Sequence, residues 1–211
     1  EVEPPKPVVV TTPHHAVDAV EYAPRDTTDA ADAIQSWFTA GRSIRLRGGG
    51  TKSAYLPPAD IVLSTREMCG IKALALNDLY VTAGAGTPLD ELQSELAGHK
   101  VWTPLATPWP ESTIGGIVAS NFNAPLRARY GAIRDLLLAM TVVMPDGRVV
   151  RAGKAVVKNV AGYDLPKLFT GSFGTLCLLT DVSLKLLPLP RDRQTLVIPV
   201  ESLAQGLQLG S

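Results

Sequence analysis

The sequence contains few of the residues that build metal centres and disulfide frameworks. Among its 211 residues are two cysteines, Cys69 and Cys177, and three histidines. The cysteines lie far apart and form no CxxC pair, which is typical of free, buried thiols in a reducing compartment. His14 and His15 lie in a proline-rich stretch and His99 stands alone, so surface positions are favoured over ligation and no metal site is predicted.

The chain also lacks an excess of charge and a long apolar run. Twenty basic residues balance twenty acidic ones, which argues against the basic face that nucleic-acid binding requires. No stretch approaches about 18 uninterrupted apolar residues, so no transmembrane helix is predicted. Residues 1–15 lack the basic segment and apolar run of a signal peptide, and we expect a cytoplasmic protein.

Periodicity and turn residues predict alternating helices and strands. Residues 1–19 form a proline-rich arm that we expect to be extended. A helix is predicted from Asp26 to a stop at Gly41, with Ala30, Ile34 and Phe38 on one apolar face. The other predicted helices begin at 87–88 and 113 and span 163–169 and 201–208. The predicted strands span 43–46, 61–64, 70–76, 79–84, 100–102, 136–144, 148–151, 176–187 and 195–200.

Three successive glycines follow the strand predicted over 43–46. Backbone N–H groups that no side chain screens can form a nest for an anion, typically a phosphate. Thr51 and Ser53 add hydroxyl donors and Lys52 adds positive charge, while the alternative interpretation is a flexible turn without a ligand. A Walker loop is excluded because Thr51 separates Gly50 from Lys52.

The glycines at 84 and 86 do not form a dinucleotide-binding motif. GxGxxG requires glycine at position 89, where the sequence has Leu89, and no acidic ribose partner follows a strand about twenty residues on. The local pattern instead predicts the start of a helix. Thr87 is expected to cap it, with Pro88 at the first helical position and Asp90 completing a capping box.

Two further glycine-rich segments each have two interpretations. Thr113 is expected to cap a short helix whose first turn contains Gly115 and Gly116. Its N–H groups could face an anion, or the glycines could permit a close contact between helix and sheet. The loop 171–175 joins a predicted helix to a predicted strand. Its small residues suit either close approach of a ligand to the backbone or tight helix–strand packing.

Together, three segments resemble the flavin-binding segments of the vanillyl-alcohol-oxidase-type FAD oxidoreductases. They are RGGGT at 47–51, TIGG at 113–116 with Asn121, and NVAGYDLPKLFTGSFGTL at 159–176. Their order is that of the family, and the resemblance covers about 42–190. Within the family the chain looks most like the FAD-binding subunit of bacterial glycolate oxidase. Family members usually have glycine at the position of Cys177 and small residues near Phe122.

The resemblance implies an α+β fold in two FAD-binding lobes. The first, 20–86, would be a small sheet with helices and the triglycine loop. The second, 87–190, would be a mostly antiparallel sheet with helices, and FAD would lie between the two. Residues 191–211 would begin a cap or substrate domain that is truncated or absent here.

The resemblance also implies which residues contact FAD. The pyrophosphate would meet 48–53 and the helix after Thr113, and the adenine end would meet the backbone of 174–179. Thr51 stands where members with covalent flavin often have histidine, which implies non-covalent FAD. Arg134 and Asp135 are interpreted as a structural pair at a strand start. The implied cofactor-binding residues are Arg47, Gly48, Gly49, Gly50, Thr51, Lys52, Ser53, Pro108, Thr113, Gly115, Gly116, Asn121, Tyr130, Gly131, Gly174, Thr175 and Leu179.

The implied function is FAD-dependent oxidation of a small 2-hydroxy acid such as glycolate. Electrons would pass to other subunits of a glycolate-oxidase-like complex, including an electron carrier, and any membrane contact would be peripheral and through these partners. No histidine lies in a flavin segment, so no general base is assigned. Two alternatives stay open. One is an FAD-holding or assembly subunit without chemistry of its own, and the other is a nucleotide-binding protein that uses the triglycine nest without flavin.

Overall fold

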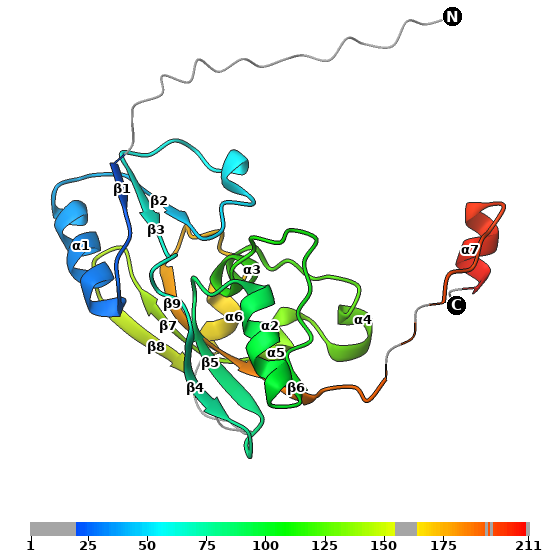
Figure 1. The fold of residues 1–211 in the computed structure, drawn as a ribbon. Helices are drawn as coiled ribbons and strands as arrows, with labels where there is room; N and C mark the ends of the chain where they lie inside the picture. The colour runs from blue at the N-terminus through cyan, green and yellow to red at the C-terminus, as the bar shows by residue number, and fades with distance from the viewer. Residues whose placement is uncertain (1–19, 155–163, 193, 195, 210–211) are drawn as a thin grey trace, which may run out of the picture.

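The computed structural model describes residues 20–154, 164–192, 194 and 196–209 (Figure 1). The predicted arm 1–19 and the start of the third glycine-rich segment lie outside the described residues. Within them, the α+β class is confirmed: helices pack on a small sheet and a larger sheet. No helix in the described parts of the chain is both long and apolar enough to cross a membrane.

The small sheet is parallel and has the strand order β1-β3-β2. Ile61 pairs with both Val20 and Ile44, and the central strand is buried along its whole length. Asp60 fixes its entry, because its carboxylate accepts hydrogen bonds of 2.8 Å from the backbone N–H and the hydroxyl of Ser43. The strands are β1 (Val20–Tyr22), β2 (Ile44–Arg47) and β3 (Ile61–Ser64).

The large sheet is antiparallel and has the order β4-β5-β9-β7-β8. The two strands at 71–84, expected in the first lobe, belong to this sheet, because Tyr80 to Gly84 pair with Lys185 to Asp181. Leu187 and Pro188 pair with Trp102 and Val101 in a separate two-stranded ladder. The strands are β4 (Ile71–Ala75), β5 (Tyr80–Gly84), β6 (Val101–Trp102), β7 (Leu137–Val143), β8 (Val149–Gly153), β9 (Leu178–Lys185) and β10 (Leu187–Pro188).

The first helix, α1 (Thr27–Thr39), joins the cores of the two sheets. Asp26 caps it by accepting hydrogen bonds from the N–H groups of Thr28 and Asp29. Its buried face, with Ala30 and Ile34, packs with residues of β3, β7 and β9. Phe38, predicted on that face, is 59% exposed instead, because it lies in the last turn of the helix and lines an open cavity.

The helices that lie between strands in the sequence cover the large sheet or lie in its connections, whereas the last helix, near the C-terminus, lies apart from the main body (Figure 1). Leu92 and Leu96 of α2 and Ile117 of α3 are fully or almost fully buried in the main core. The helices are α2 (Leu89–Gly98), α3 (Ile114–Ser120), α4 (Arg127–Tyr130), α5 (Ile133–Leu136), α6 (Leu165–Phe169) and α7 (Leu203–Leu209), with a 3₁₀ turn η1 (Ser53–Tyr55).

The structure corrects the predicted cap of α2. Its N-cap is Pro88, which offers no side-chain bond. Thr87 is buried, and its hydroxyl donates to the carbonyl of Gly84 at 2.7 Å and accepts from the N–H of Gly70 at 3.0 Å. The Thr87 hydroxyl therefore provides a hydrogen-bond partner for backbone groups of two neighbouring turns. The pattern of helix-start residues does not show that these groups require a partner.

Two other local predictions are wrong. Residues 196–200 form no strand, because no other strand pairs with them, and only the helix predicted after them is present, as α7. Arg134 and Asp135 begin a helix rather than a strand, and no ion pair joins them in the described structure. The Asp135 carboxylate accepts the N–H of Ala132 at 2.8 Å instead.

The two thiols differ, although both were expected to be buried. Cys69 is exposed and Cys177 is buried. Burial raises the pKa of the Cys177 thiol to about 12, because a thiolate there would lose its hydration. At neutral pH this thiol is therefore protonated, and only the thiolate is nucleophilic.

We expect iodoacetamide at pH 8 to modify Cys69 and to leave Cys177 unmodified in the folded protein. In urea both thiols should react, because Cys177 then loses the burial that raises its pKa. Mass spectrometry gives the number of adducts, and Cys69→Ser is the control that should show no adduct until it is denatured. Modification of native Cys69→Ser would contradict the burial of Cys177.

Candidate functional site

The triglycine segment forms a cradle at the end of β2. Gly50 has a φ of +80°, a conformation that favours glycine. Of the backbone N–H groups in this segment, that of Ser53 donates to the carbonyl of Gly50 at 3.1 Å. The N–H groups of 48–52 have no acceptor among the described residues. Unpaired donors grouped in this way suit an anion, as the sequence predicted.

The cradle packs closely against the segment that precedes α3. A Cβ on Gly48 would overlap the hydroxyl of Thr113, and a Cβ on Gly49 would overlap the carbonyl oxygen of Glu111. These glycines are therefore needed for packing between the two segments as well as for open N–H groups. The cavity of about 80 Å³ beside them is lined by Leu46, Arg47, Gly48, Gly49, Gly50, Thr51, Lys52, Ser53, Leu56, Ser112, Thr113, Gly116, Ser120 and Phe173.

The start of α3 contributes less to an anion site than the sequence suggested. Its N–H groups already have partners: that of Ile114 donates to Thr87, that of Gly115 donates to Ala85, and that of Gly116 donates to the Thr113 hydroxyl. A Cβ on Gly115 would overlap Ala85, which favours the close helix–sheet contact at this residue. Gly116 is exposed and lines the cradle cavity.

The Lys52 side chain places its ammonium over two aromatic rings. Its Nζ is 4.0 Å from the ring centroid of Trp109 and 5.4 Å from that of Phe122. Desolvation lowers the pKa of Lys52, because part of its hydration is replaced by these rings and the neighbouring loop. The two basic residues of the motif have different partners. Arg47 forms an ion pair with Glu21, whereas Lys52 contacts the aromatic rings.

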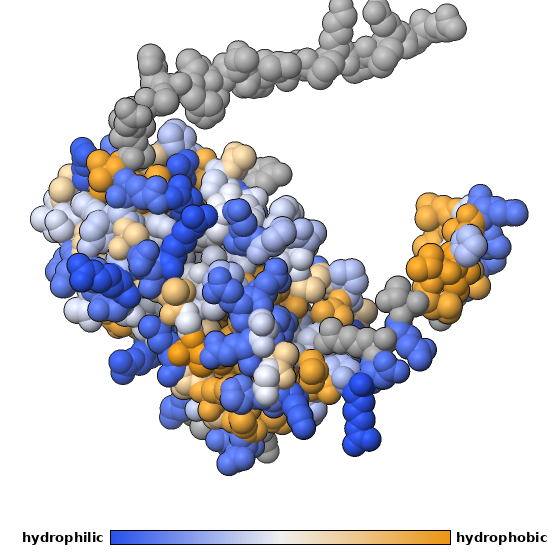
Figure 2. Space-filling view, viewed as in Figure 1, coloured by the Kyte–Doolittle hydropathy of each residue, from blue (hydrophilic) through white to orange (hydrophobic). Residues whose placement is uncertain are grey.

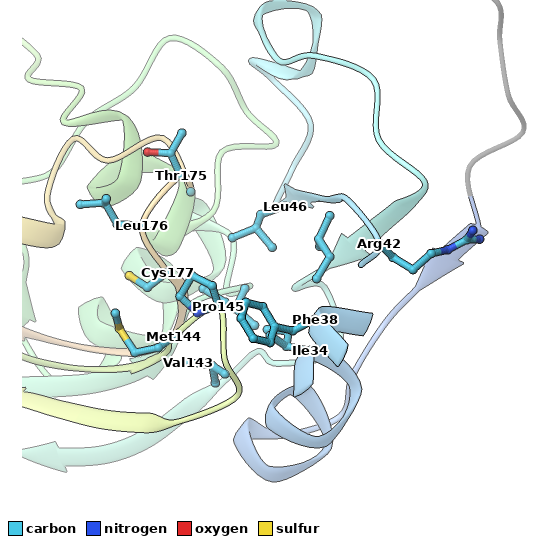
Figure 3. Close-up of a pocket in the computed structure, with 13 residues that line it drawn as sticks. Ile34, Phe38, Arg42, Leu46, Val143, Met144, Pro145, Thr175, Leu176 and Cys177 are labelled. Atoms are coloured by element: carbon cyan, nitrogen blue, oxygen red, sulfur yellow. The ribbon is translucent and has the colours of Figure 1, made fainter. Parts of the chain in front are cut away.

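A second cavity, of about 210 Å³, adjoins the cradle at Leu46 (Figure 3). Figure 3 shows Phe38 and Ile34 of α1 on one side and Pro145 and Cys177 on the other, and all four residues line the cavity. Gly174 reaches its wall with a φ of +74°, and a Cβ there would lie 3.1 Å from Leu46. The lining residues are Ile34, Phe38, Arg42, Ile44, Leu46, Val143, Met144, Pro145, Gly174, Thr175, Leu176, Cys177 and Leu178.

The structure thus brings most of the predicted site residues into two adjoining cavities. Arg47 to Ser53, Thr113 and Gly116 line the first, and Gly174 and Thr175 line the second. Both cavities lie where the small sheet and α1 meet the large sheet and its helices. The resemblance implied a cofactor between the two lobes, which is this position.

Six predicted residues line neither cavity, and one of them is Gly115, which packs against Ala85. Leu179 is buried in the main core, and Pro108 is exposed on its loop. The Tyr130 ring packs edge-on against Trp102 at 5.4 Å, and Gly131 ends α4 with a φ of +89°. Asn121 ends α3 in the left-handed conformation, and its side-chain oxygen accepts from Asn123 at 2.9 Å.

Sequence reasoning missed several residues that shape the site. Glu111 supplies the carbonyl that faces Gly49, Phe173 lines the cradle, and Phe38 and Pro145 line the second cavity. Phe173 has a φ of +52°, which its place within the loop 171–175 could have suggested. Nothing in the local pattern marks the other three, because their contacts cross between distant segments.

Comparison with known proteins supports a relationship over most of the chain. Residues 19–153 match the family model described as FAD binding domain. The glycolate oxidase subunit GlcE of Escherichia coli is 37% identical over 68% of this chain and 42% of its own length. The glycolate oxidase subunit GlcD of Bacillus subtilis is 31% identical over 90% of this chain and 41% of its own.

Other relatives have different names. The D-lactate dehydrogenase of Archaeoglobus fulgidus is 29% identical over 94% of this chain and 45% of its own length. The chain therefore spans less than half the length of these curated relatives. A solved structure of alkyldihydroxyacetonephosphate synthase superposes with a TM-score of 0.72 at 21% identity, covering 82% of this chain and 32% of that one, and shares the fold.

The sequence relationship, the fold and the cradle of unpaired N–H groups agree with one another. The chain belongs to the FAD binding domain family, its α+β fold is of the vanillyl-alcohol-oxidase type, and FAD is its cofactor.

Proposed function

We propose that the cradle 48–53 binds the pyrophosphate of FAD and that the second cavity holds the adenine end. The observation that carries this assignment is the set of N–H groups at 48–52 without an acceptor in the described structure. Backbone donors of this kind bind phosphate oxygens without reorganisation. The apolar walls of the adjoining cavity, including Phe38, Leu46 and Pro145, suit a flat aromatic base.

We further propose that the chain is the FAD-binding part of a flavin-dependent dehydrogenase or oxidase of a small 2-hydroxy acid. Support comes from relatives that are named glycolate oxidase subunits and D-lactate dehydrogenases. FAD, when bound, supplies the capacity to accept a hydride equivalent. The chain's own residues would bind and orient the cofactor: the cradle through its N–H groups, and Thr113 and Gly116 by closing one side of the cavity.

The partners would be other subunits of a glycolate-oxidase-like complex, one of them an electron carrier. Two relatives are named as subunits, which supports this proposal. The segment 196–209 also exposes apolar side chains, among them Leu196, Val197 and Leu203, and Figure 2 shows it as a largely apolar group beside the main body. A cytoplasmic location, with any membrane contact through these partners, belongs to the same proposal.

A pair of isosteric substitutions at Gly116 tests the anion cradle. Gly116 is the third residue of α3 after Thr113, so either Gln or Glu there would form a capping box and preserve the helix. Because Gly116 lines the cavity, both side chains would lie beside it, but Glu adds a negative charge. We expect Gly116→Glu to weaken FAD binding about tenfold or more relative to Gly116→Gln.

Flavin fluorescence titration gives the two affinities, and circular dichroism controls for folding. Equal FAD affinity in Gly116→Glu and Gly116→Gln would show that no anion binds beside α3.

We propose that FAD is held without a covalent bond, because Thr51 and Lys52 follow the third glycine where relatives with covalent flavin often have histidine. Acid precipitation of the FAD-loaded protein should therefore release all flavin absorbance into the supernatant. A yellow pellet whose colour survives denaturing electrophoresis would show a covalent attachment.

Substrate reduction of the bound flavin tests the activity. The chain, purified together with the subunits that accompany it, is mixed anaerobically with glycolate, D-lactate or acetate as the control. We expect the 2-hydroxy acids to bleach the visible flavin band and acetate to leave it unchanged, because acetate has no hydroxyl-bearing carbon to oxidise. A complex that binds FAD but bleaches with none of them would identify the chain as an FAD-holding subunit.

A further inference from the structure

Lys52, Trp109 and Phe122 form a cluster that the motif reasoning did not connect. The two rings meet edge to face, with centroids 4.8 Å apart and planes at 69°, and the Lys52 ammonium lies over the Trp109 ring. The three residues come from three connections: the loop after β2, the segment before α3 and the segment after α3. We call them the Lys52 cluster.

The cluster fixes a positive charge without neutralising it. The ion pairs among the described residues are Arg47–Glu21, Arg148–Asp146 and Lys167–Asp164, and Lys52 is in none of them. An aromatic ring attracts an ammonium through its quadrupole and carries no net charge of its own. No carboxylate among the described residues therefore cancels the charge of Lys52.

Hydrogen bonds hold the backbones that carry the two rings. The backbone N–H of Trp109 donates to the Thr107 hydroxyl at 3.3 Å, and the N–H of Ser112 donates to the carbonyl of Trp109 at 3.1 Å. The N–H of Phe122 donates to Ile117 of α3 at 3.2 Å. The same short segment carries Glu111 and Thr113, which contact the cradle glycines, so one frame positions both the N–H groups and the ammonium.

We propose that Trp109 and Phe122 are positioning residues that hold the Lys52 ammonium at the cradle as an uncompensated charge for the pyrophosphate of FAD. This inference rests on the proposed function. Lys52 lines the same cavity as the unpaired N–H groups of 48–52, whereas Trp109 and Phe122 do not, so the rings hold the lysine without filling the space of the anion. A free lysine would lose side-chain entropy on binding, and the rings remove part of that loss beforehand.

The test measures affinities for FAD and ADP, which share the pyrophosphate, at low and high salt. We expect Lys52→Met to weaken both ligands about tenfold and to reduce the salt dependence of binding, because a charge contact is lost. Trp109→Leu should weaken both ligands severalfold through the freed lysine. Trp109→Phe keeps an aromatic face over the ammonium and should retain most of the affinity.

The double variant separates positioning of Lys52 from simple packing. In the Lys52→Met background, Trp109→Leu should cause no further loss, since its effect passes through the ammonium. A full additional loss there would overturn the inference and make Trp109 a packing residue. Thermal unfolding of each variant identifies any that fail to fold, and Trp109→Phe then provides the comparison.

The outcomes also distinguish this inference from the proposed function. If Lys52→Met binds FAD and ADP like the wild type, the inference fails and the proposed cradle stands. If Lys52→Met weakens the binding of FAD but leaves the binding of ADP unchanged, the ammonium contacts the flavin end of FAD. The assignment of Lys52 to the pyrophosphate is then wrong. If the wild-type chain binds neither ligand, both the cradle assignment and the inference fall.

Discussion

Close packing at glycines joins the small sheet to the rest of the molecule. The end of β2 approaches the segment before α3 at Gly48 and Gly49, where any Cβ would overlap Thr113 or the carbonyl of Glu111. A third close contact lies at Gly174, against Leu46 of β2. All three positions border the two cavities. Because glycine has no side chain, the segments approach closely at these positions, and this close approach determines the shape of the site.

The remaining structure stabilises this junction from behind. Ala30 and Ile34 of α1 share a buried cluster with Leu63 of β3 and with Val143 and Leu178 of the large sheet. Because the cluster draws on both sheets, burial of apolar surface favours one relative arrangement of them. The cavities lie at the edge of this cluster, where Ile34 and Leu178 change from core to lining.

The electrostatics of the junction follow from the partners of its two cations. Arg47 begins the motif but is neutralised by Glu21 of β1, so it ties two strands together. Lys52 meets only aromatic rings among the described contacts and retains its charge beside the unpaired N–H groups. Two cations five positions apart therefore have different partners, a carboxylate and aromatic rings, which their spacing does not distinguish.

The sequence by itself determined the elements and the motifs of this protein. Hydrophobic periodicity located α1 and most strands, start and stop residues indicated α2, and the glycine segments identified the cradle, because short-range patterns govern these features. Its errors, at Thr87, Phe38 and 196–200, concern residues whose environment comes from distant segments. Only the tertiary structure decided that β4 and β5 join the large sheet, that Gly115 packs on Ala85, and that Trp109 covers Lys52. These contacts link residues far apart in the chain, and packing and backbone hydrogen bonding across the whole fold select them.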